Sequence, residues 1–115
     1  MRVPQIAMRK SRGLASFDLE AGERFPLHMF MTGTGAKSDA ISVITVALAT
    51  ADALGWKGSE AEKYYRFVGE MRDVAAEIGM NDTYFMNVTG DNGNYGTPED
   101  FIKLMNILIL MLQAL

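Results

Sequence analysis

The sequence of 115 residues has no cysteine and a single histidine, His28. Without thiols the chain forms no disulfide and no thiolate metal site. A lone imidazole also argues against a histidine-based metal centre or catalytic triad, so we expect no cofactor. The net charge is −3 and the chain has no basic cluster. Because phosphate binding needs concentrated Lys and Arg, nucleic acid is not an expected partner.

Long hydrophobic runs are also scarce. The most apolar stretch, residues 101–115, is shorter than the ~20 residues that span a bilayer, and it contains Lys103 and Asn106. We therefore expect a core or interface helix there and no transmembrane segment. Residues 1–13 include basic side chains but no continuous apolar core, so they do not resemble a signal peptide.

Residues 39–55 predict a first long helix. Several of them are β-branched, which alone leaves helix and strand open, but the length and the alanine content favour helix. Ser38 is expected to cap its start, Asp39 suits the positive end of the helix dipole, and Gly55 is expected to close it.

Residues 59–79 predict a second long helix. Ser59 and Glu62 form a capping box, and Gly79 is the expected C-terminal stop, with Met80 folding back as its hydrophobic partner. Apolar residues at three- and four-residue steps form one stripe that should face a core. These residues are Tyr64, Phe67, Val68, Met71, Val74, Ala75 and Ile78.

Residues 97–114 predict a third long helix, with Thr97 as cap, Pro98 at the first position and acidic residues in the first turn. Beyond Ile102 this helix is apolar nearly all round, so other protein must surround it. The expected interface residues are Phe101, Leu104, Leu108, Met111 and Leu112.

The first part of the chain is less regular. Residues 1–25 predict an irregular arm for which a small β-ribbon is one option, with residues 13–19 as a short strand. Pro26 and Gly33 suit the two ends of a short helix, and residues 32–38 are expected to form a loop. The prediction is one mainly α domain over residues 1–115, with three long helices and a short one.

The segment between the last two helices is rich in turn residues. Asp91 could begin a calcium-binding loop, but Gly93, Tyr95 and Ile102 would occupy ligand positions, so the pattern does not fit. An Asn-Gly turn at residues 92–93 explains the segment better.

Residues 67–108, FVGEMRDVAAEIGMNDTYFMNVTGDNGNYGTPEDFIKLMNIL, resemble the serine-type D-Ala-D-Ala carboxypeptidases, the low-molecular-mass penicillin-binding proteins. The family pattern is F-V-x-x-M-N-x-x-A, then L-G-M, then T-x-F-x-N-x-x-G-L, then a helix start S-T-A-x-D. The matching positions are Phe67, Val68, Met71, Ala75, Gly79, Met80, Thr83, Phe85, Asn87, Gly90, Thr97 and Asp100. The departures are Arg72, Asp91, Gly96 and Pro98, where the family has Asn, Leu, Ser and Ala.

A weaker similarity continues upstream, so that the resemblance covers roughly residues 16–110, the family's helical subdomain. It implies a parent reaction in which a serine is acylated and terminal D-alanine is released from peptidoglycan stem peptides. That chemistry uses the motifs S-x-x-K, S-x-N and K-T-G. This sequence has no S-x-x-K and no K-T-G, and its S-x-N position is Ala36, Lys37 and Ser38. We therefore expect no peptidase activity.

Two hypotheses follow. In the first, the chain is a fragment or relic of such a carboxypeptidase and lacks the flanking parts of its fold. In the second, it is a non-catalytic helical module that forms a homo-oligomer or docks on a partner through residues 101–115. An unrelated enzyme is least favoured, because no carboxylate pair, metal cluster or phosphate loop stands out. The family works outside the cytoplasm, whereas no signal peptide is expected here, so no compartment is assigned.

Overall fold

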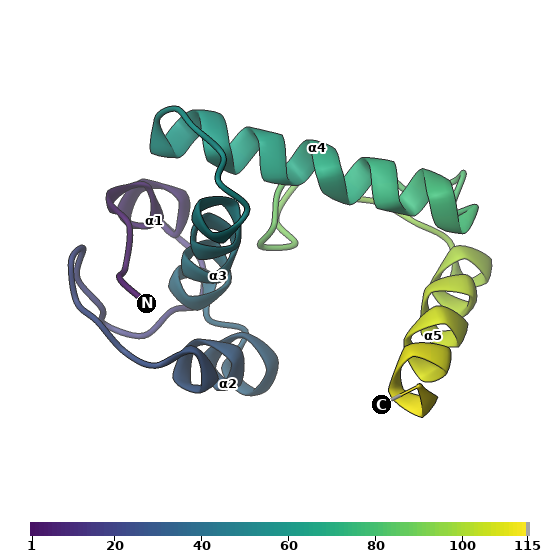
Figure 1. Ribbon diagram of the computed structural model, residues 1–115, viewed down its shortest axis with the longest axis horizontal. Helices are drawn as coiled ribbons and strands as arrows, with labels where there is room; N and C mark the ends of the chain where they lie inside the picture. Colours follow the sequence, from purple (N-terminus) through teal and green to yellow (C-terminus); the bar gives the residue numbers. More distant parts are fainter. Residues whose placement is uncertain (115) are drawn as a thin grey trace. The chain divides into compact units, whose positions relative to one another are not determined.

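The computed structural model describes residues 1–114, apart from the side chain of Lys37, and it is mainly α, as predicted (Figure 1). Its helices are α1 (Gln5–Lys10), α2 (Leu27–Lys37), α3 (Ala40–Ala53), α4 (Glu60–Ile78) and α5 (Pro98–Gln113). The chain divides into two compact units, Met1–Phe67 and Val68–Leu115, and the boundary falls within α4. That the chain forms one domain stays a prediction.

In the first unit, α3 contacts both α1 and α2 (Figure 1). Its buried face is made mainly of Ala and β-branched residues, which pack closely because they carry little side-chain freedom, and it also contains Ser42 and Leu48. The buried apolar side chains of this unit are Val3, Ile6, Ala7, Phe30, Ala40, Ile41, Ile44, Ala47, Leu48, Ala51 and Tyr64.

The N-terminal arm contains a helix, α1, that the sequence analysis did not predict. Its start is capped from far along the chain: the Glu60 carboxylate accepts hydrogen bonds from the backbone N–H groups of Gln5 and Ile6, at 3.2 and 2.8 Å. The expected β-ribbon is reduced to one isolated bridge between Arg2 and Arg24, within the described residues of the arm. Residues 13–19 form no strand.

The prediction of a short helix that ends at Gly33 and of a loop over residues 32–38 was wrong, because α2 continues to Lys37. Gly33 was interpreted as a helix end, but it is a packing contact. A Cβ atom there would lie 2.5 Å from Ser42 Oγ and 3.2 Å from Ser42 Cβ. Glycine therefore allows α2 and α3 to approach each other closely, and this contact outweighs its weak helix propensity.

The predicted cap of α3 was also wrong. Asp39, not Ser38, caps it: the Asp39 carboxylate accepts a hydrogen bond from Ser42 N–H. Because α2 extends to Lys37, only Ser38 and Asp39 connect it to α3, and Ser38 adopts a left-handed conformation with φ 52°.

Helix α4 begins and ends as predicted. The Ser59 hydroxyl accepts from Glu62 N–H, and the Glu62 carboxylate accepts from Ser59 N–H, at 3.1 and 3.3 Å. Gly79 has φ +89°. The N–H of Met80 donates to the carbonyl of Ala75, which with the Gly79 bond to Ala76 makes a Schellman motif. In the predicted stripe, Tyr64, Val68 and Ala75 are buried, whereas Val74 is exposed.

The connection from α3 to α4 carries the one tryptophan of the sequence. The backbone N–H of Trp56 donates to the carbonyl of Ala51 at 3.0 Å. The Arg66 guanidinium lies 4.1 Å from the centroid of its ring, a cation–π contact. The indole is thus fixed against α4 within the first unit.

We predict that Gly33→Ala destabilises the protein by about 1–3 kcal/mol, the usual cost of overpacking, because Ser42 is buried and its Cβ cannot rotate away. Gly35→Ala is the matched control, since α2 leaves open space around Gly35. It should stabilise the helix by about 0.5–1 kcal/mol. Urea denaturation measures both. Equal stability of the two variants would contradict the close α2–α3 packing.

Candidate functional site

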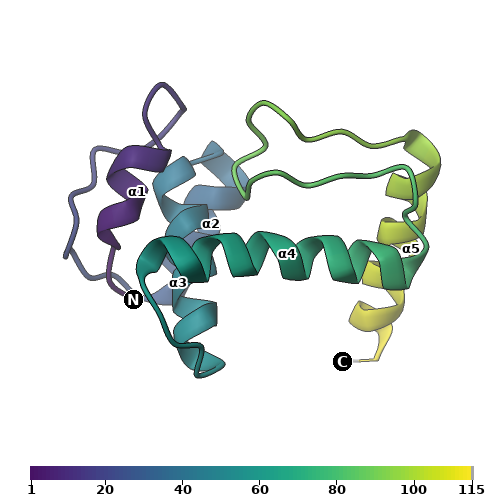
Figure 2. The same ribbon diagram turned by 90° about the horizontal axis from the view of Figure 1, so that it is seen from above.

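Residues 79–97, between α4 and α5, form a hairpin-shaped excursion whose two arms run side by side (Figure 2). Tyr84 and Tyr95 exchange two backbone hydrogen bonds of 2.9 and 3.1 Å, and their rings stack with centroids 5.8 Å apart. Arg72 on α4 contacts the first arm of the hairpin at Tyr84 and Phe85. Its Nε donates to the carbonyl of Phe85 at 2.6 Å, and its guanidinium lies 4.6 Å from the Tyr84 ring.

Two asparagine side chains build the tip of the hairpin. Asn87 Oδ1 accepts from Gly90 N–H at 2.9 Å, from Asp91 N–H at 3.1 Å and from Asn94 Nδ2 at 2.8 Å. Asn94 Oδ1 accepts from the N–H groups of Met86 and Asn87. These bonds replace the regular ladder that a longer hairpin would have.

A buried carboxylate fastens the base of the hairpin to α5. Asp100 is 2% exposed, and its Oδ2 accepts from Asp82 N–H at 2.9 Å and from the Thr83 hydroxyl at 2.7 Å. Lys103 Nζ lies 3.6 Å from the other oxygen and donates to the carbonyl of Gly79 at 2.9 Å. The first two turns of α5, through Lys103 and Asp100, thereby hold the end of α4 and the start of the hairpin.

These contacts lower the pKa of Asp100 below its ordinary value of 3.8. The Thr83 hydrogen bond is the largest cause, and the Asp82 N–H and Lys103 act in the same direction, while desolvation opposes them. The Asp100 carboxyl is thus held in its ionised form.

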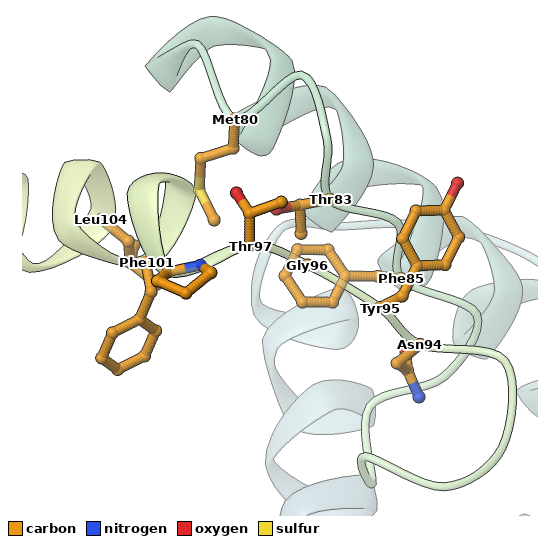
Figure 3. Close-up of a pocket in the computed structure, with 10 residues that line it drawn as sticks. Met80, Thr83, Phe85, Asn94, Tyr95, Gly96, Thr97, Phe101 and Leu104 are labelled. Carbon is orange, nitrogen blue, oxygen red and sulfur yellow. The ribbon is translucent and has the colours of Figure 1, made fainter.

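A cavity of about 460 Å³ lies between the hairpin and α5. Figure 3 shows side chains from both arms of the hairpin and from the start of α5 around it. The lining residues are Met80, Thr83, Phe85, Asn94, Tyr95, Gly96, Thr97, Pro98, Phe101 and Leu104. Most of the lining is apolar, and the Thr83 hydroxyl donates its hydrogen bond to the Asp100 carboxylate. Among residues 1–114, no three acidic or histidine side chains are placed to hold a metal ion.

The fold that carries this site is similar to part of a known enzyme structure. The chain has the fold of part of a D-alanyl-D-alanine carboxypeptidase. The structure matches the crystal structure of the carboxypeptidase DacD from Francisella tularensis with a TM-score of 0.76 and 25% sequence identity, over 95% of this chain. The chain spans only 24% of the length of DacD. No protein-family model matches the sequence, and no match was found among curated proteins.

Several of the residues that match the carboxypeptidase pattern are hydrogen-bonded to one another in this structure. Thr83 and Thr97 both hydrogen-bond to Asp100, through its carboxylate and its N–H respectively. Asn87 accepts from the N–H of Gly90. These matching residues therefore contribute contacts that shape the hairpin, and the sequence pattern alone did not reveal their pairing.

The S-x-N position lies at the junction of α2 and α3. Ala36 and Ser38 are exposed, and the side chain of Lys37 lies outside what the structure describes. The polar group that organises the junction is the neighbouring Asp39, which is 1% exposed. Its Oδ1 accepts from Phe17 N–H at 2.9 Å and its Oδ2 accepts from the Ser42 hydroxyl. Sequence reasoning treated Asp39 only as a dipole partner and missed this clamp.

Helix α5 carries the predicted interface residues. Phe101, Leu108, Met111 and Leu112 are exposed, and Leu104 is half-buried. In α5 itself, Asp100 is the buried residue. None of the helices in the described part of the chain combines the length and the hydropathy that a membrane span requires.

We predict that Asp100→Asn lowers the urea midpoint of unfolding, because the variant loses the ionised acceptor of Asp82 N–H and Thr83. Glu99→Gln removes the same charge from the same helical turn at an exposed position and should have a smaller effect. If Glu99→Gln costs as much stability as Asp100→Asn, the loss comes from the interaction with the helix dipole and not from the hydrogen bonds of Asp100.

The same pair predicts a dependence on pH. Since the folded pKa of Asp100 lies below 3.8, its carboxylate contributes its full stability above that value and loses it as the pH falls through the folded pKa. The advantage of the wild-type protein over Asp100→Asn should be constant at neutral pH and should shrink below pH 3.8. Urea titrations at several acidic pH values measure this difference, and a pH-independent difference would contradict it.

Proposed function

We propose that this chain is the helical part of a carboxypeptidase-like protein and that it acts as a wall of that fold without carrying the catalytic groups. The observation that supports this most is the structural match to DacD over nearly the whole chain, combined with a length that corresponds to about a quarter of DacD. The mutual hydrogen bonds of the pattern residues, around Asp100 and Asn87, add a second and independent support.

The proposed lack of activity rests on the chemistry of acyl transfer. A serine attacks a peptide carbonyl only when a base takes its proton and donors stabilise the oxyanion. In the parent family, a lysine three residues after the serine has the first role. No serine of this sequence has such a lysine, and the S-x-N position has lost both its serine and its asparagine, as Ala36 and Ser38.

The exposed surface of α5 supports the idea that further protein belongs around it. Ile107, Leu108, Ile109 and Leu110 are consecutive, and each is between 38% and 61% exposed. Because successive residues of a helix differ by about 100° in direction, these four point to all sides. A helix that is apolar on every side is stable only when it is enclosed. The remainder of a carboxypeptidase-like fold would enclose it in this way.

We predict that a fluorescent penicillin does not label the protein covalently on a denaturing gel, since no serine is activated. A complete D-Ala-D-Ala carboxypeptidase, run beside it, is the positive control. A second sample, unfolded before the penicillin is added, separates specific labelling from chance acylation. Labelling of the folded chain alone would mean that a serine here is activated, and the proposal of a non-catalytic wall would fail.

A homodimer through α5 is the second candidate function, because nine large apolar side chains of this helix are exposed among the described residues. They are Phe101, Ile102, Met105, Ile107, Leu108, Ile109, Leu110, Met111 and Leu112. A two-fold contact would cover one side of α5 and leave the others in water, so we place this candidate after enclosure by a larger fold.

Solution mass distinguishes the two candidates. The dimer hypothesis predicts one discrete species of twice the chain mass, and predicts that Leu108→Asp or Leu112→Asp converts it to monomer or insoluble protein. Leu54→Asp is the control, since Leu54 is 63% exposed at the end of α3. A dimer that survives both α5 substitutions would exclude α5 as the interface. A heterogeneous aggregate of the wild-type chain would favour a subdomain with an uncovered helix.

A further inference from the structure

The tip of the hairpin contains the sequence Asp91-Asn92-Gly93-Asn94, and both Asn92 and Gly93 are exposed. Gly93 adopts φ +98°, a conformation that residues with a side chain rarely adopt. From this placement we propose that Asn92 is a site of spontaneous deamidation in the folded protein, and that the tip of the hairpin is converted in part to an isoaspartyl form. The proposal does not depend on the proposed function.

The chemistry needs only the chain and water. The backbone nitrogen of Gly93 loses its proton and attacks Cγ of Asn92, so that an N–Cγ bond forms, the Cγ–Nδ2 bond breaks and ammonia leaves. Water then opens the resulting succinimide. Attack at Cγ restores the normal backbone and gives aspartate, whereas attack at the α-carbonyl breaks its bond to the Gly93 nitrogen and leaves the chain running through Cγ as isoaspartate. The sum is asparagine plus water giving an acid and ammonia.

The following residue makes Asn92 different from the other four asparagines. Gly93 has no side chain to obstruct its own nitrogen, whereas Asn81, Asn87, Asn94 and Asn106 precede Asp, Val, Tyr and Ile. Two of these four are also held by their surroundings. The side chains of Asn87 and Asn94 hydrogen-bond to each other and to several backbone groups of the tip. Asn106 lies inside α5, where the backbone N–H of the next residue, Ile107, belongs to the helix and is not free to attack.

Conversion to isoaspartate would alter the tip in two ways. It adds a negative charge beside Asp91, and it lengthens the backbone by one methylene between residues that the tip holds closely. Asn87 Nδ2 donates to the carbonyl of Asn92 at 3.2 Å, and Asn87 Oδ1 accepts from Gly90 and Asp91. We expect the isoaspartyl fraction to lose the bond to residue 92 and part of the protection of these two amides.

Peptide mapping by mass spectrometry tests the proposal on the whole chain. The folded protein is incubated in neutral buffer at physiological temperature, in parallel with a sample kept in denaturant. The expected result is a mass shift of amide to acid that grows with time in the native sample and is confined to the peptide with Asn92. An isoaspartyl methyltransferase should label the same peptide. Hydrogen exchange should show reduced protection of Gly90 and Asp91 in the modified fraction.

Variants make the assignment specific. Asn92→Gln places the amide one methylene further away, disfavours the five-membered ring and should abolish both the mass shift and the methyl label. Asn92→Asp supplies the charge, and when it is measured directly after purification, before the slower loss of water to the same succinimide, its backbone is normal and the Gly90 and Asp91 amides should stay protected. Gly93→Ala is unsuitable as a control, because a Cβ there would lie 2.5 Å from Met86 Sδ. Deamidation at Asn92 in denaturant but not in the native protein would overturn the proposal, as would equal deamidation of the other asparagines.

Discussion

The structure depends on satisfying backbone N–H groups at helix starts and chain reversals, and in the described part of the chain three carboxylates do this between segments that are distant in sequence. Asp39 caps α3 and also binds an amide of the N-terminal arm. Glu60 reaches from the start of α4 to the start of α1. Asp100 joins the first turn of α5 to the beginning of the hairpin. The first four N–H groups of a helix have no partner within it, and an ionised acceptor forms the stronger kind of hydrogen bond. In this small chain, each carboxylate fixes one segment against another.

The features that the sequence predicted well are those encoded within a few residues. The capping box of Ser59 and Glu62, the Gly79 stop and the Thr97 cap with Pro98 all act over one helical turn, so their residues are neighbours in sequence and in space. The mainly α architecture followed from them and is confirmed. The carboxypeptidase resemblance was strongest over the same region, and the structure agrees with it at the level of the fold.

The features that were missed depend on partners distant in sequence. Helix α1 receives its cap from Glu60, 54 residues after Ile6, and no local pattern reveals that. Glycine commonly ends a helix, so Gly33 was interpreted in that way, and only the approach of α3 shows that it allows close packing. The cavity beside the hairpin has Phe85 and Phe101 in the same lining, which the spacing of residues does not specify. Of the candidate site, the sequence therefore indicated the segments and the matching residues but not their pairing or the space between them.

The location of the aromatic residues has a practical consequence. Trp56, held by the Arg66 guanidinium, belongs to the unit Met1–Phe67, whereas the stacked pair of Tyr84 and Tyr95 belongs to Val68–Leu115. Trp56 is the one tryptophan of the sequence, so its indole fluorescence follows the unit Met1–Phe67 without any added label, whereas Tyr64 and Tyr65 also lie in that unit and phenol signals come from both. Because the unit boundary lies inside one continuous helix, and Arg66 contacts the indole from the first half of α4, this signal reports on that half of the helix separately from the half after Phe67.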